Sequence, residues 1–441
     1  MNTTTRTVEV VVVGSGPGGA SVARGLAQAG VDVLLLERGH NHTWLGNHLA
    51  ALRFSDRLGL SFSEEGLHVV RALTLGGSTV MYCGSATRPP EWLARDYGID
   101  LSAYVDQTIE ELALEPLPDD VVGTGALRIQ EAADALGYRF ERFRKFIDPH
   151  RCRSRCGGTC MLGCPYEAKW TARAYVEDVV AAGGEVYTRA RVDEVRLTDG
   201  VATGVVARTP DGRLEVEAEV VIISAGGIGT PAILQRSGLH EAGVGMFIDP
   251  LVFVTGVSRH RGTALGPPMS VGTYELIDDG IVLSDLIDPW GLWLALTAWK
   301  NPRRVRDLRS YRRMLGLMVK IGDEREGFVT VDERVSKPMS ARDRYRLNRG
   351  AAISREILIE AGCAPDSVIV GPVRGAHPGG TARIGEVVDT DLRTRIPGLY
   401  ACDASVLPEA LDRPVVLTAI GLGKRLADHL LDTAFAGRTG R

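Results

Sequence analysis

The sequence predicts an α/β fold, because apolar strands alternate with helices at both ends of the chain and run into glycine-rich turns. Residues 8–13 are almost wholly apolar and β-branched, which is typical of a parallel strand buried on both faces. The glycine-rich run 14–19 follows at once, and apolar residues then recur at helical spacing up to Gly30, a helix-stop signal. A second apolar strand at 31–36 ends in Glu37. This order predicts a Rossmann-type dinucleotide-binding domain.

Each part of this motif has a physical role. Gly14 permits the tight turn, Gly16 lets the backbone approach a pyrophosphate, and Gly19 lets the helix pack on the strand. The free N–H groups and the positive dipole end of the helix N-terminus favour phosphate binding. Glu37 can accept hydrogen bonds from an adenosine ribose, which favours a dinucleotide without a 2′-phosphate. The motif does not separate FAD from NAD.

Length and composition set outer limits on the function. The chain has 441 residues, enough for two or three domains, and its net charge of −4 gives no sign of a nucleic-acid partner. The N-terminus shows no signal-peptide pattern, and no run of about 20 apolar residues is present. We therefore expect a cytoplasmic protein, in which the seven cysteines are reduced thiols or metal ligands.

The order of strands, helices and turns predicts a division into domains. Apolar strands with Asp-Gly turns at 199–200 and 211–212 lead to a second glycine-rich turn that starts at Ala225. Segments 252–258 and 281–286 resemble strands of a mixed or antiparallel sheet. The predicted domains are a discontinuous nucleotide-binding domain (1–88, 165–250 and 371–441), a helical insertion (89–150), a Cys-rich loop (151–164) and an α+β substrate domain (251–370).

Four cysteines fall within thirteen residues: Cys152, Cys156, Cys160 and Cys164. The last spacing, followed by Pro165, matches the end of ferredoxin-type runs, so a [4Fe-4S] cluster is one interpretation. A structural zinc is a second interpretation, although paired CxxC spacing is usual for zinc. The third is that the thiols brace a loop without metal. A cluster would carry electrons singly from a flavin to an outside acceptor.

A tryptophan-rich segment continues into a basic run between residues 290 and 313. Trp290, Trp293 and Trp299 precede seven cations and one acid: Lys300, Arg303, Arg304, Arg306, Arg309, Arg312, Arg313 and Asp307. Aromatic residues beside cations can mark a segment that lies in a membrane interface. The alternatives are a lid of the substrate domain with solvated arginines, or a surface for a partner protein.

Five motifs, in order along the chain, resemble those of the glucose–methanol–choline (GMC) family of FAD-dependent oxidoreductases. They are GSGPGG with Glu37, LGGSTV at 75–80, AGGIGTPAILQRSG at 225–238, HPGGTARIG at 377–385 and LYACDASVLPE at 399–409. Together they span nearly the whole chain. The cysteine run continuing into Pro165, Tyr166 and Lys169 resembles a segment of long-chain alcohol oxidase-like members.

The resemblance implies FAD as the cofactor, with its ADP part on residues 14–19 and Glu37. It implies that residues 76–78 lie near the flavin and that Asp403 and Ala404 contact the pyrophosphate and ribityl region. The candidate cofactor-binding residues are Gly14, Gly16, Gly19, Glu37, Arg38, Gly76, Gly77, Ser78, Val192, Ala225, Asp403, Ala404 and Thr418.

The resemblance places His377 beside flavin N5 as the base of alcohol oxidation. When an alcohol is oxidised, its hydroxyl loses a proton and its carbon loses a hydride. Near neutral pH a histidine can accept the proton, and flavin N5 can accept the hydride. Family members usually carry a second His or Asn where this chain has Arg413-Pro414, and many carry Asn where it has Tyr82. Arg413 would favour an anionic substrate or stabilise a reduced flavin. Arg413 and Tyr82 are therefore the other catalytic candidates.

The predicted function is dehydrogenation of an alcohol to a carbonyl, with electrons passing to a protein or quinone through the Cys-rich segment. The tryptophan-rich segment favours a large or apolar substrate and allows peripheral membrane contact through 290–313. Three rival functions share the flavin site: a C=C or carbonyl reductase, a lyase with a structural FAD, and a non-catalytic electron-transfer flavoprotein.

Overall fold

Strand β1 (Asn2–Val13) is the centre of the first sheet in this computed structural model, which describes residues 2–153, 156–263, 266–300 and 309–436. It pairs in parallel with β2 and β10, and β7 and β20 extend the parallel part. Two antiparallel strands, β9 and β8, follow β10. The bounds are β2 Val33–Glu37, β7 Glu185–Thr188, β8 Arg191–Thr198, β9 Val201–Thr209, β10 Gly212–Ile223 and β20 Leu399–Ala401. Three separated pieces of chain therefore build this sheet, as the sequence predicts.

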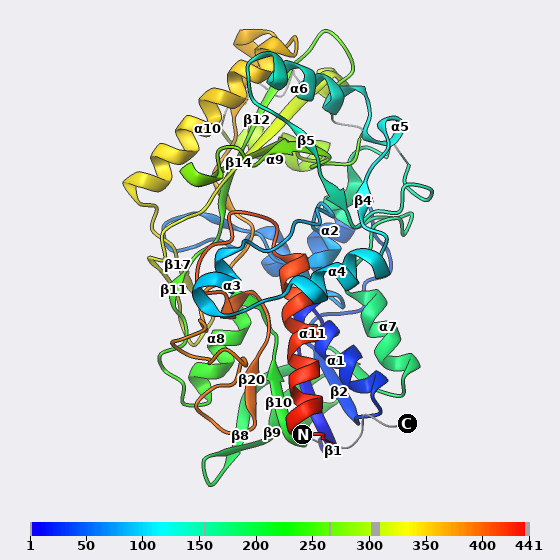
Figure 1. Ribbon diagram of the computed structural model, residues 1–441, viewed down its shortest axis with the longest axis vertical. Coiled ribbons are helices and arrows are strands. Elements are labelled where there is room, and N and C mark those ends of the chain that lie inside the picture. The colour runs from blue at the N-terminus through cyan, green and yellow to red at the C-terminus, as the bar shows by residue number, and fades with distance from the viewer. Residues whose placement is uncertain (1, 154–155, 264–265, 301–308, 437–441) are drawn as a thin grey trace.

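The two faces of this sheet carry different cores because side chains alternate along β1. Val10 and Val12 belong to the core that contains α1 (Pro17–Gln28), α7 (Arg173–Ala181) and α11 (Val416–Thr433). Val11 and Val13 belong to the opposite core, which contains α8 (Gly226–Arg236). Figure 1 shows α11 and α1 lying side by side along the sheet.

Helices α1 and α11 approach closely because glycines lie at their contact. A side-chain carbon on Gly25 would lie 2.7 Å from Cβ of Ala427, and one on Gly423 would lie 2.5 Å from the carbonyl oxygen of Gly18. The first helix of the chain is thus held against the last one.

The second sheet has eight strands, and its pairing is mainly antiparallel. Strands β12 and β15 form its centre, and β14, β13 and β5 follow on one side, β19 and β3 on the other. The bounds are β3 His68–Val69, β5 Glu141–Arg142, β12 Pro250–Val257, β13 Val271–Thr273, β14 Ile281–Asp285, β15 Met314–Ile321, β18 Ile369–Val370 and β19 Arg374–Gly375. The predicted antiparallel sheet of the substrate half is therefore present.

Alternation along β12 and β15 separates a packed face from an open one. Val252, Val254, Leu317 and Val319 pack with α10 (Ala341–Glu360) in one core. Leu251, Phe253 and Met318 point to the other face, together with Met269 and Leu286. That other face lines the cavity described below. Helix α10 begins at a capping box in which Ser340 and Asp343 satisfy each other's backbone N–H groups.

The remaining helices largely match the sequence expectations, and α7 differs at its start. The sequence predicts a helix over 166–182 that ends at Gly183 and Gly184, but α7 begins only at Arg173, because residues 167–171 are irregular and the Lys169 side chain is buried. The other helices are α2 His48–Phe54, α3 Trp92–Tyr97, α4 Ser102–Glu111, α5 Asp119–Val122, α6 Thr124–Ala135 and α9 Trp290–Lys300. Short strands are β4 Glu115–Pro116, β6 Arg144–Lys145, β11 Val244–Met246, β16 Gly327–Val329 and β17 Val335–Ser336.

Strand pairing crosses two of the predicted domain boundaries, so the domain division stays a prediction. Strand β3 lies within 1–88 but pairs with β19 of the second sheet, and β5 lies within the helical insertion but pairs with β13. The basic positions 303, 304 and 306 lie outside the described residues. Across the ranges that the structure covers, no helix combines the length and the apolar character needed to cross a membrane.

Candidate active site

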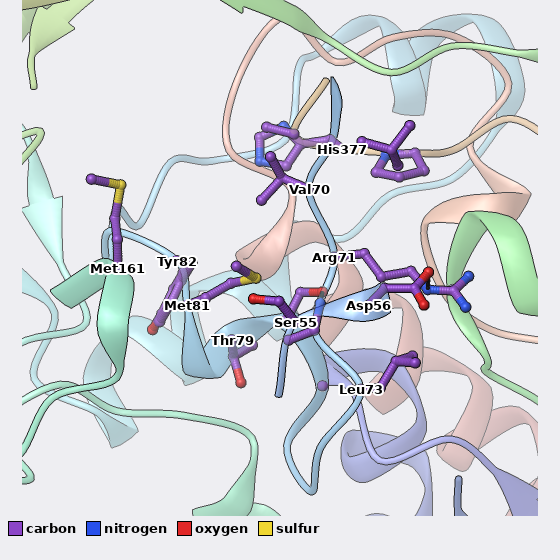
Figure 2. A pocket seen from close by; sticks show the side chains of 18 of the residues that line it. Ser55, Asp56, Val70, Arg71, Leu73, Thr79, Met81, Tyr82, Met161 and His377 are labelled. Carbon is purple, nitrogen blue, oxygen red and sulfur yellow. Dashed lines mark hydrogen bonds and ion pairs between the residues drawn. The ribbon is translucent and has the colours of Figure 1, made fainter. Parts of the chain in front are cut away.

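One large cavity, of about 1080 Å³, lies where the two sheets face each other. Its wall includes the turns that follow β1 and β10, the segment at Asp403, and the open face of the second sheet. Pockets for drug-sized ligands measure about 300–1,000 Å³, so this cavity has room for a dinucleotide together with a substrate. Figure 2 shows Val70, Met81, Tyr82 and Met161 around the same hollow as His377.

The turn after β1 fits a dinucleotide. Gly14 has a φ of 109°, and a side-chain carbon there would lie 2.1 Å from the carbonyl oxygen of Ser224. A carbon on Gly19 would lie 2.1 Å from the carbonyl oxygen of Gly14, which agrees with its expected role in helix–strand packing. A carbon on Gly16 would meet no atom within 4 Å, because Gly16 borders the cavity. The backbone at Gly16 is therefore open to a phosphate.

Glu37 lies at the cavity wall, at the end of β2, as the motif predicts. Its carboxylate accepts hydrogen bonds from Ser15 Oγ at 2.5 Å and from the Gly39 backbone N–H at 2.7 Å. Burial raises the pKa of Glu37 above its ordinary value, against the effect of these hydrogen bonds. The residue thus ties together the two turns that would flank an adenosine.

Asp403 organises the second side of the nucleotide wall. Its carboxylate accepts hydrogen bonds from Thr230 Oγ1 at 2.6 Å and from the Gly226 backbone N–H at 2.7 Å. It also accepts a hydrogen bond from the Ser405 backbone N–H at 2.7 Å. The carboxylate therefore joins the start of α8 to the segment after β20, two pieces that come from distant parts of the sequence.

Most of the other predicted cofactor residues border the cavity. These are Arg38, Gly77, Ser78, Val192, Ala225 and Ala404. Gly76 lies behind the wall, where its N–H donates to Ser15 Oγ. Thr418 is fully buried and does not line the cavity; the residues of α11 that do are Val416 and Ala419. Contact between Thr418 and a cofactor is therefore not supported.

His377 forms a buried polar group with Asp249 and Lys320 at the cavity wall. Its Nδ1 lies 2.9 Å from Asp249 Oδ2, and Lys320 Nζ lies 2.7 Å from the same oxygen. Asp249 is fully buried, whereas the His377 side chain is 23% exposed. Figure 2 shows the His377 ring directed into the pocket. Lys320 also lines the cavity but is only 2% exposed, so His377 is the member of the group most accessible to a ligand.

The protonation of this group follows from its surroundings. Burial raises the pKa of Asp249, but the Lys320 cation and the His377 hydrogen bond outweigh it and bring that pKa below its ordinary value. Burial and the Lys320 cation lower the pKa of His377, against the pull of Asp249. His377 is therefore neutral near pH 7. An ionised Asp249 accepts a hydrogen bond from Nδ1–H, which leaves Nε2 as the basic nitrogen.

The other two catalytic candidates receive less support. The Tyr82 ring lines the cavity, but its hydroxyl donates to the Trp170 carbonyl at 2.8 Å and burial raises its pKa well above the usual value. Arg413 does not line the cavity. Its Nε donates to the Leu411 carbonyl at 3.1 Å, and Pro414 and Val415 form the wall instead. The predicted role of Arg413 beside the flavin is not supported, because the backbone turns its side chain away.

The metal prediction for Cys152, Cys156, Cys160 and Cys164 is likewise not supported. All four thiols are free, and among the described residues no three His, Cys, Asp or Glu side chains are close enough to hold a metal ion. Burial raises the pKa of the Cys152 and Cys160 thiols to about 12. Cys160 packs in a hydrophobic core, so this segment has the character of the third interpretation, a loop braced without metal.

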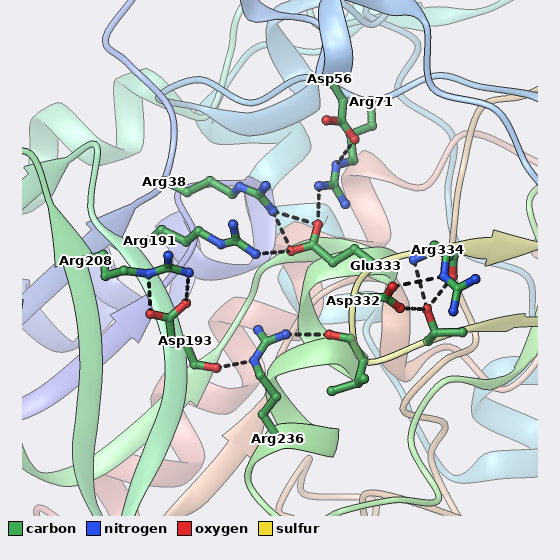
Figure 3. Close-up of polar contacts among 12 residues, drawn as sticks. Arg38, Asp56, Arg71, Arg191, Asp193, Arg208, Arg236, Asp332, Glu333 and Arg334 are labelled. Carbon is green, nitrogen blue, oxygen red and sulfur yellow. Dashed lines mark hydrogen bonds and ion pairs between the residues drawn. The ribbon is translucent and has the colours of Figure 1, made fainter.

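A cluster of ion pairs closes the nucleotide side of the cavity (Figure 3). The Glu333 carboxylate, at the tip of the β16–β17 hairpin, lies 2.9 Å from Arg38, 2.8 Å from Arg71 and 3.6 Å from Arg191. Burial opposes ionisation of Glu333, but the two nearer arginines bring its pKa down to about 2. All four side chains line the cavity. A hairpin of the second half is thereby fastened to the turn that follows Glu37.

Family models match most of the chain. The N-terminal GMC oxidoreductase model matches residues 11–250, and the C-terminal GMC oxidoreductase model matches residues 281–423. The chain belongs to the GMC oxidoreductase family. As a GMC oxidoreductase it is a member of a flavoprotein family, and the predicted fold class with its Rossmann-type domain is confirmed.

Similar proteins include other GMC oxidoreductases. An uncharacterised protein of Methanocaldococcus jannaschii is 28% identical, over 96% of this chain and 100% of that one. An uncharacterised GMC-type oxidoreductase of Mycobacterium tuberculosis is 27% identical, over 96% of this chain and 75% of that one. A long-chain-alcohol oxidase of Arabidopsis thaliana is 24% identical, over 97% of this chain and 68% of that one.

Two solved structures share the fold of this GMC oxidoreductase. Pyridoxine 4-oxidase from Mesorbium loti has a TM-score of 0.68 at 17% identity, over 96% of this chain and 99% of that one. Aspergillus oryzae formate oxidase has a TM-score of 0.70 at 15% identity, over 97% of this chain and 98% of that one. The chain thus has the architecture of known GMC enzymes over nearly its whole length.

Three residues of the site went unnoticed in the sequence: Asp249, Lys320 and Glu333. The sequence offered a clue to Lys320, because a single charged residue in the otherwise apolar strand β15 must be buried with a partner. Asp249 carried a weaker one, as an acid directly before a buried strand. Glu333 carried none, because its arginine partners are up to 295 residues away in sequence.

Proposed function

We propose that this protein oxidises an alcohol to a carbonyl compound at a bound FAD. The observation that carries the proposal is the neutral His377, held by Asp249 at the wall of a cavity that also includes a dinucleotide turn. A base with a free nitrogen, beside the expected position of a hydride acceptor, is what alcohol oxidation requires.

FAD, when bound, supplies the acceptor for the hydride. The residues that would hold it are the open turn at Gly16, the pair Glu37 and Asp403, and the backbone of residues 77–78, all of which line the cavity. At Gly16 no side chain stands between the backbone and the cavity, which allows close approach of a phosphate.

His377 takes the proton of the substrate hydroxyl at Nε2. Asp249 fixes the ring through Nδ1–H and stabilises the imidazolium that forms, in the manner of an acid–histidine pair. Lys320, which contacts the same carboxylate oxygen, holds Asp249 ionised. The ring is thereby oriented before the substrate arrives, so little reorganisation accompanies proton transfer.

The substrate we propose carries a large apolar part. The wall nearest His377 on the second sheet consists of Leu251, Phe253, Met269, Leu286 and Met318, and Met81 and Met161 continue it. Arg374 also lines the cavity, but Asp288 neutralises it through two hydrogen bonds, at 2.7 and 2.5 Å. The Arg374 charge is therefore compensated on this side of the cavity, which suits a neutral alcohol better than an anion.

The acceptor that reoxidises the flavin is also part of the proposal. We keep a quinone or a partner protein as the acceptor and derive no step through the cysteines of residues 152–164, since they do not form a metal site. Reoxidation of the reduced protein by dissolved quinone, compared with oxygen, measures this preference directly.

Anaerobic bleaching of the flavin by an alcohol series tests the proposed function. We expect primary alcohols to bleach the bound flavin, with the half-saturating concentration falling about threefold for each added methylene until the cavity is filled. Product analysis should show the matching aldehyde. No bleaching by any alcohol would contradict the proposal and favour a lyase, whereas bleaching by saturated carbonyl or alkane donors alone would favour a reductase.

The substitution Lys320→Met should shift the pH profile of flavin reduction. In the natural protein the rate should fall only below the lowered pKa of His377, where the base becomes protonated. Without the Lys320 cation, the Asp249 carboxylate stabilises the imidazolium form of His377 more strongly, and Asp323 and Asp412 lie nearby. The pKa of His377 should therefore rise, and the rate of flavin reduction should begin to fall at a higher pH than in the natural protein. Stopped-flow reduction between pH 5 and 9 measures the shift; Lys424→Met, in a surface ion pair on α11, is the control.

A further inference from the structure

The segment that follows the nucleotide turn exposes an unusual number of large apolar side chains. Six of them, together with Trp290 at the start of α9, form what we call the mouth surface: Trp44, Leu49, Leu52, Leu58, Leu60, Phe62 and Trp290. Leu60 is 69% exposed, Leu49 64% and Leu58 61%, and both tryptophans are more than half exposed. Apolar side chains gathered on one face of a soluble protein mark an interaction site.

The mouth surface is continuous and borders the cavity. Trp44, Leu49, Leu52 and Trp290 also line the cavity, so they surround its opening. The His48 ring lies 5.0 Å from the Trp290 ring, and the Gly291 N–H donates to His48 Nε2, which joins α2 to the start of α9. A side-chain carbon on Gly59 would lie 3.8 Å from Leu52, so the turn with Leu58 and Leu60 continues the same surface.

The turn that presents Leu58 is held in a conformation that side chains disfavour. Arg57 and Leu58 have φ values of 49° and 57°, in the left-handed region that β-carbons resist, and Gly59 continues the turn at 78°. Hydrogen bonds fasten both ends, since Asp56 N–H donates to the Arg71 carbonyl and Val69 N–H to the Ser61 carbonyl. Strained backbone that is fixed from both sides is characteristic of functional loops.

The charges around the mouth surface are cationic. Arg53 and Arg57 are exposed within the segment 44–62, whose sole carboxylate, Asp56, pairs with Arg71 at 3.2 Å. Arg309, Arg312 and Arg313 are exposed just beyond α9, where Tyr311 packs against Trp293. The carboxylates that follow are engaged elsewhere: Glu65 accepts from Ser336 and Lys337, and Glu64 lies 3.9 Å from Arg334.

We propose that the mouth surface docks on an anionic lipid membrane, with Trp44, Leu58, Leu60 and Trp290 entering the headgroup region. Apolar and aromatic side chains framed by arginines complement such a surface, because the cations attract anionic headgroups and the apolar groups enter the acyl boundary. The cavity then opens toward the bilayer, so an apolar substrate passes from lipid to His377 without crossing water. That delivery role rests on the proposed alcohol oxidation, whereas the lipid binding does not.

Vesicle sedimentation of the purified flavoprotein tests the docking. The probes are phosphatidylcholine vesicles and vesicles with phosphatidylcholine and phosphatidylglycerol at about 3:1. The test variant is Leu58→Asp with Leu60→Asp; aspartate tolerates left-handed backbone better than leucine, so the turn should be kept. The matched control is Leu197→Asp with Val201→Asp. These side chains are 44% and 42% exposed and lie on the β8–β9 hairpin, at the bottom of the molecule in Figure 1.

We expect the natural protein and the control to sediment with the anionic vesicles and less with the neutral ones, and the test variant to bind about tenfold more weakly. A blue shift of tryptophan fluorescence should accompany binding. No sedimentation, or equal sedimentation of the test variant, would overturn the proposal. A third outcome would also overturn it: the natural protein is a dimer by sedimentation equilibrium, the test variant is a monomer, and neither binds vesicles. In that case a second copy of the chain would cover the mouth surface.

Flavin bleaching by a short, dissolved alcohol keeps the two proposals apart. Leu58 and Leu60 lie outside the cavity wall, so the test variant should be bleached as fast as the natural protein. Loss of vesicle binding with retained bleaching would separate docking from chemistry. Absence of bleaching in every form would refute the proposed oxidation and leave the lipid result standing on its own.

Discussion

Replacing His377 with alanine is expected to slow the reduction of the bound flavin by an alcohol about 100- to 10,000-fold, the usual contribution of a positioned base. The reason is that His377 lines the cavity and is the most exposed member of the buried group with Asp249 and Lys320. Anaerobic stopped-flow absorbance gives the rate. The flavin content should be unchanged, because the residues expected to hold the ADP part, Gly16 and Glu37, lie on other segments than His377.

A second substitution, at Asp249, distinguishes the role of the base His377 from the role of the carboxylate that orients it. Asp249→Asn keeps the shape but removes the charge that orients Nδ1–H, so the rate should fall by a smaller factor and the acidic limb should move to lower pH. Added imidazole should restore part of the activity of His377→Ala and none of the activity of Asp249→Asn. If His377→Ala reduced its flavin at the natural rate, the base would have to be another group.

The substitution Glu333→Gln should have the largest effect on stability and on flavin retention. It removes the anion that Arg38, Arg71 and Arg191 share and leaves their positive charges facing one another. Breaking a largely buried ion pair from one side costs about 3 kcal/mol of unfolding free energy. Since the arginines line the nucleotide side of the cavity, FAD should also leave the variant about ten times faster or more.

The pH dependence of this contribution follows from the pKa of Glu333, which is lowered from 4.5 to about 2 in the folded chain. The stabilisation is complete above pH ~4.5 and is lost as the pH falls toward 2, because the carboxylate must then be protonated. Thermal unfolding and the release of FAD fluorescence measure both effects. Glu241→Gln, which opens an exposed ion pair with Arg395, is the control and should change neither. Equal FAD release by the two variants would refute the role of Glu333.

The sequence predicts a larger part of the fold than of the candidate site. Strand 8–13, the turn at Gly14 and the acid Glu37 are local signals, and each depends on neighbours in sequence. The helices at 102–111 and 341–360 also follow from local periodicity and capping. Asp403 and His377 were found through motifs. Their partners, Thr230 and Asp249, lie 173 and 128 residues away, and no local pattern reports a contact over that distance.

For Arg413 and the cysteines, the structure gives no support to the roles that the sequence suggests. A residue at a motif position lines a site only if the backbone aims it there, and Arg413 turns toward Leu411 while Pro414 and Val415 take its place. Four cysteines in thirteen residues suggest a ligand set by count and spacing alone. Among the described residues no three such side chains come close enough to hold a metal ion, and spacing cannot reveal whether side chains converge.

The close packing of α1 against α11 has a consequence for how the chain is made. Helix α1 is synthesised long before its partner α11, which begins at Val416. Strand β20, which extends the parallel sheet beside β10, also follows much later in the sequence. The apolar face of α1 therefore lacks its partner until α11 has been made, and the nucleotide pocket cannot be completed before then. We therefore expect a truncated chain that ends before β20 to fail to retain FAD.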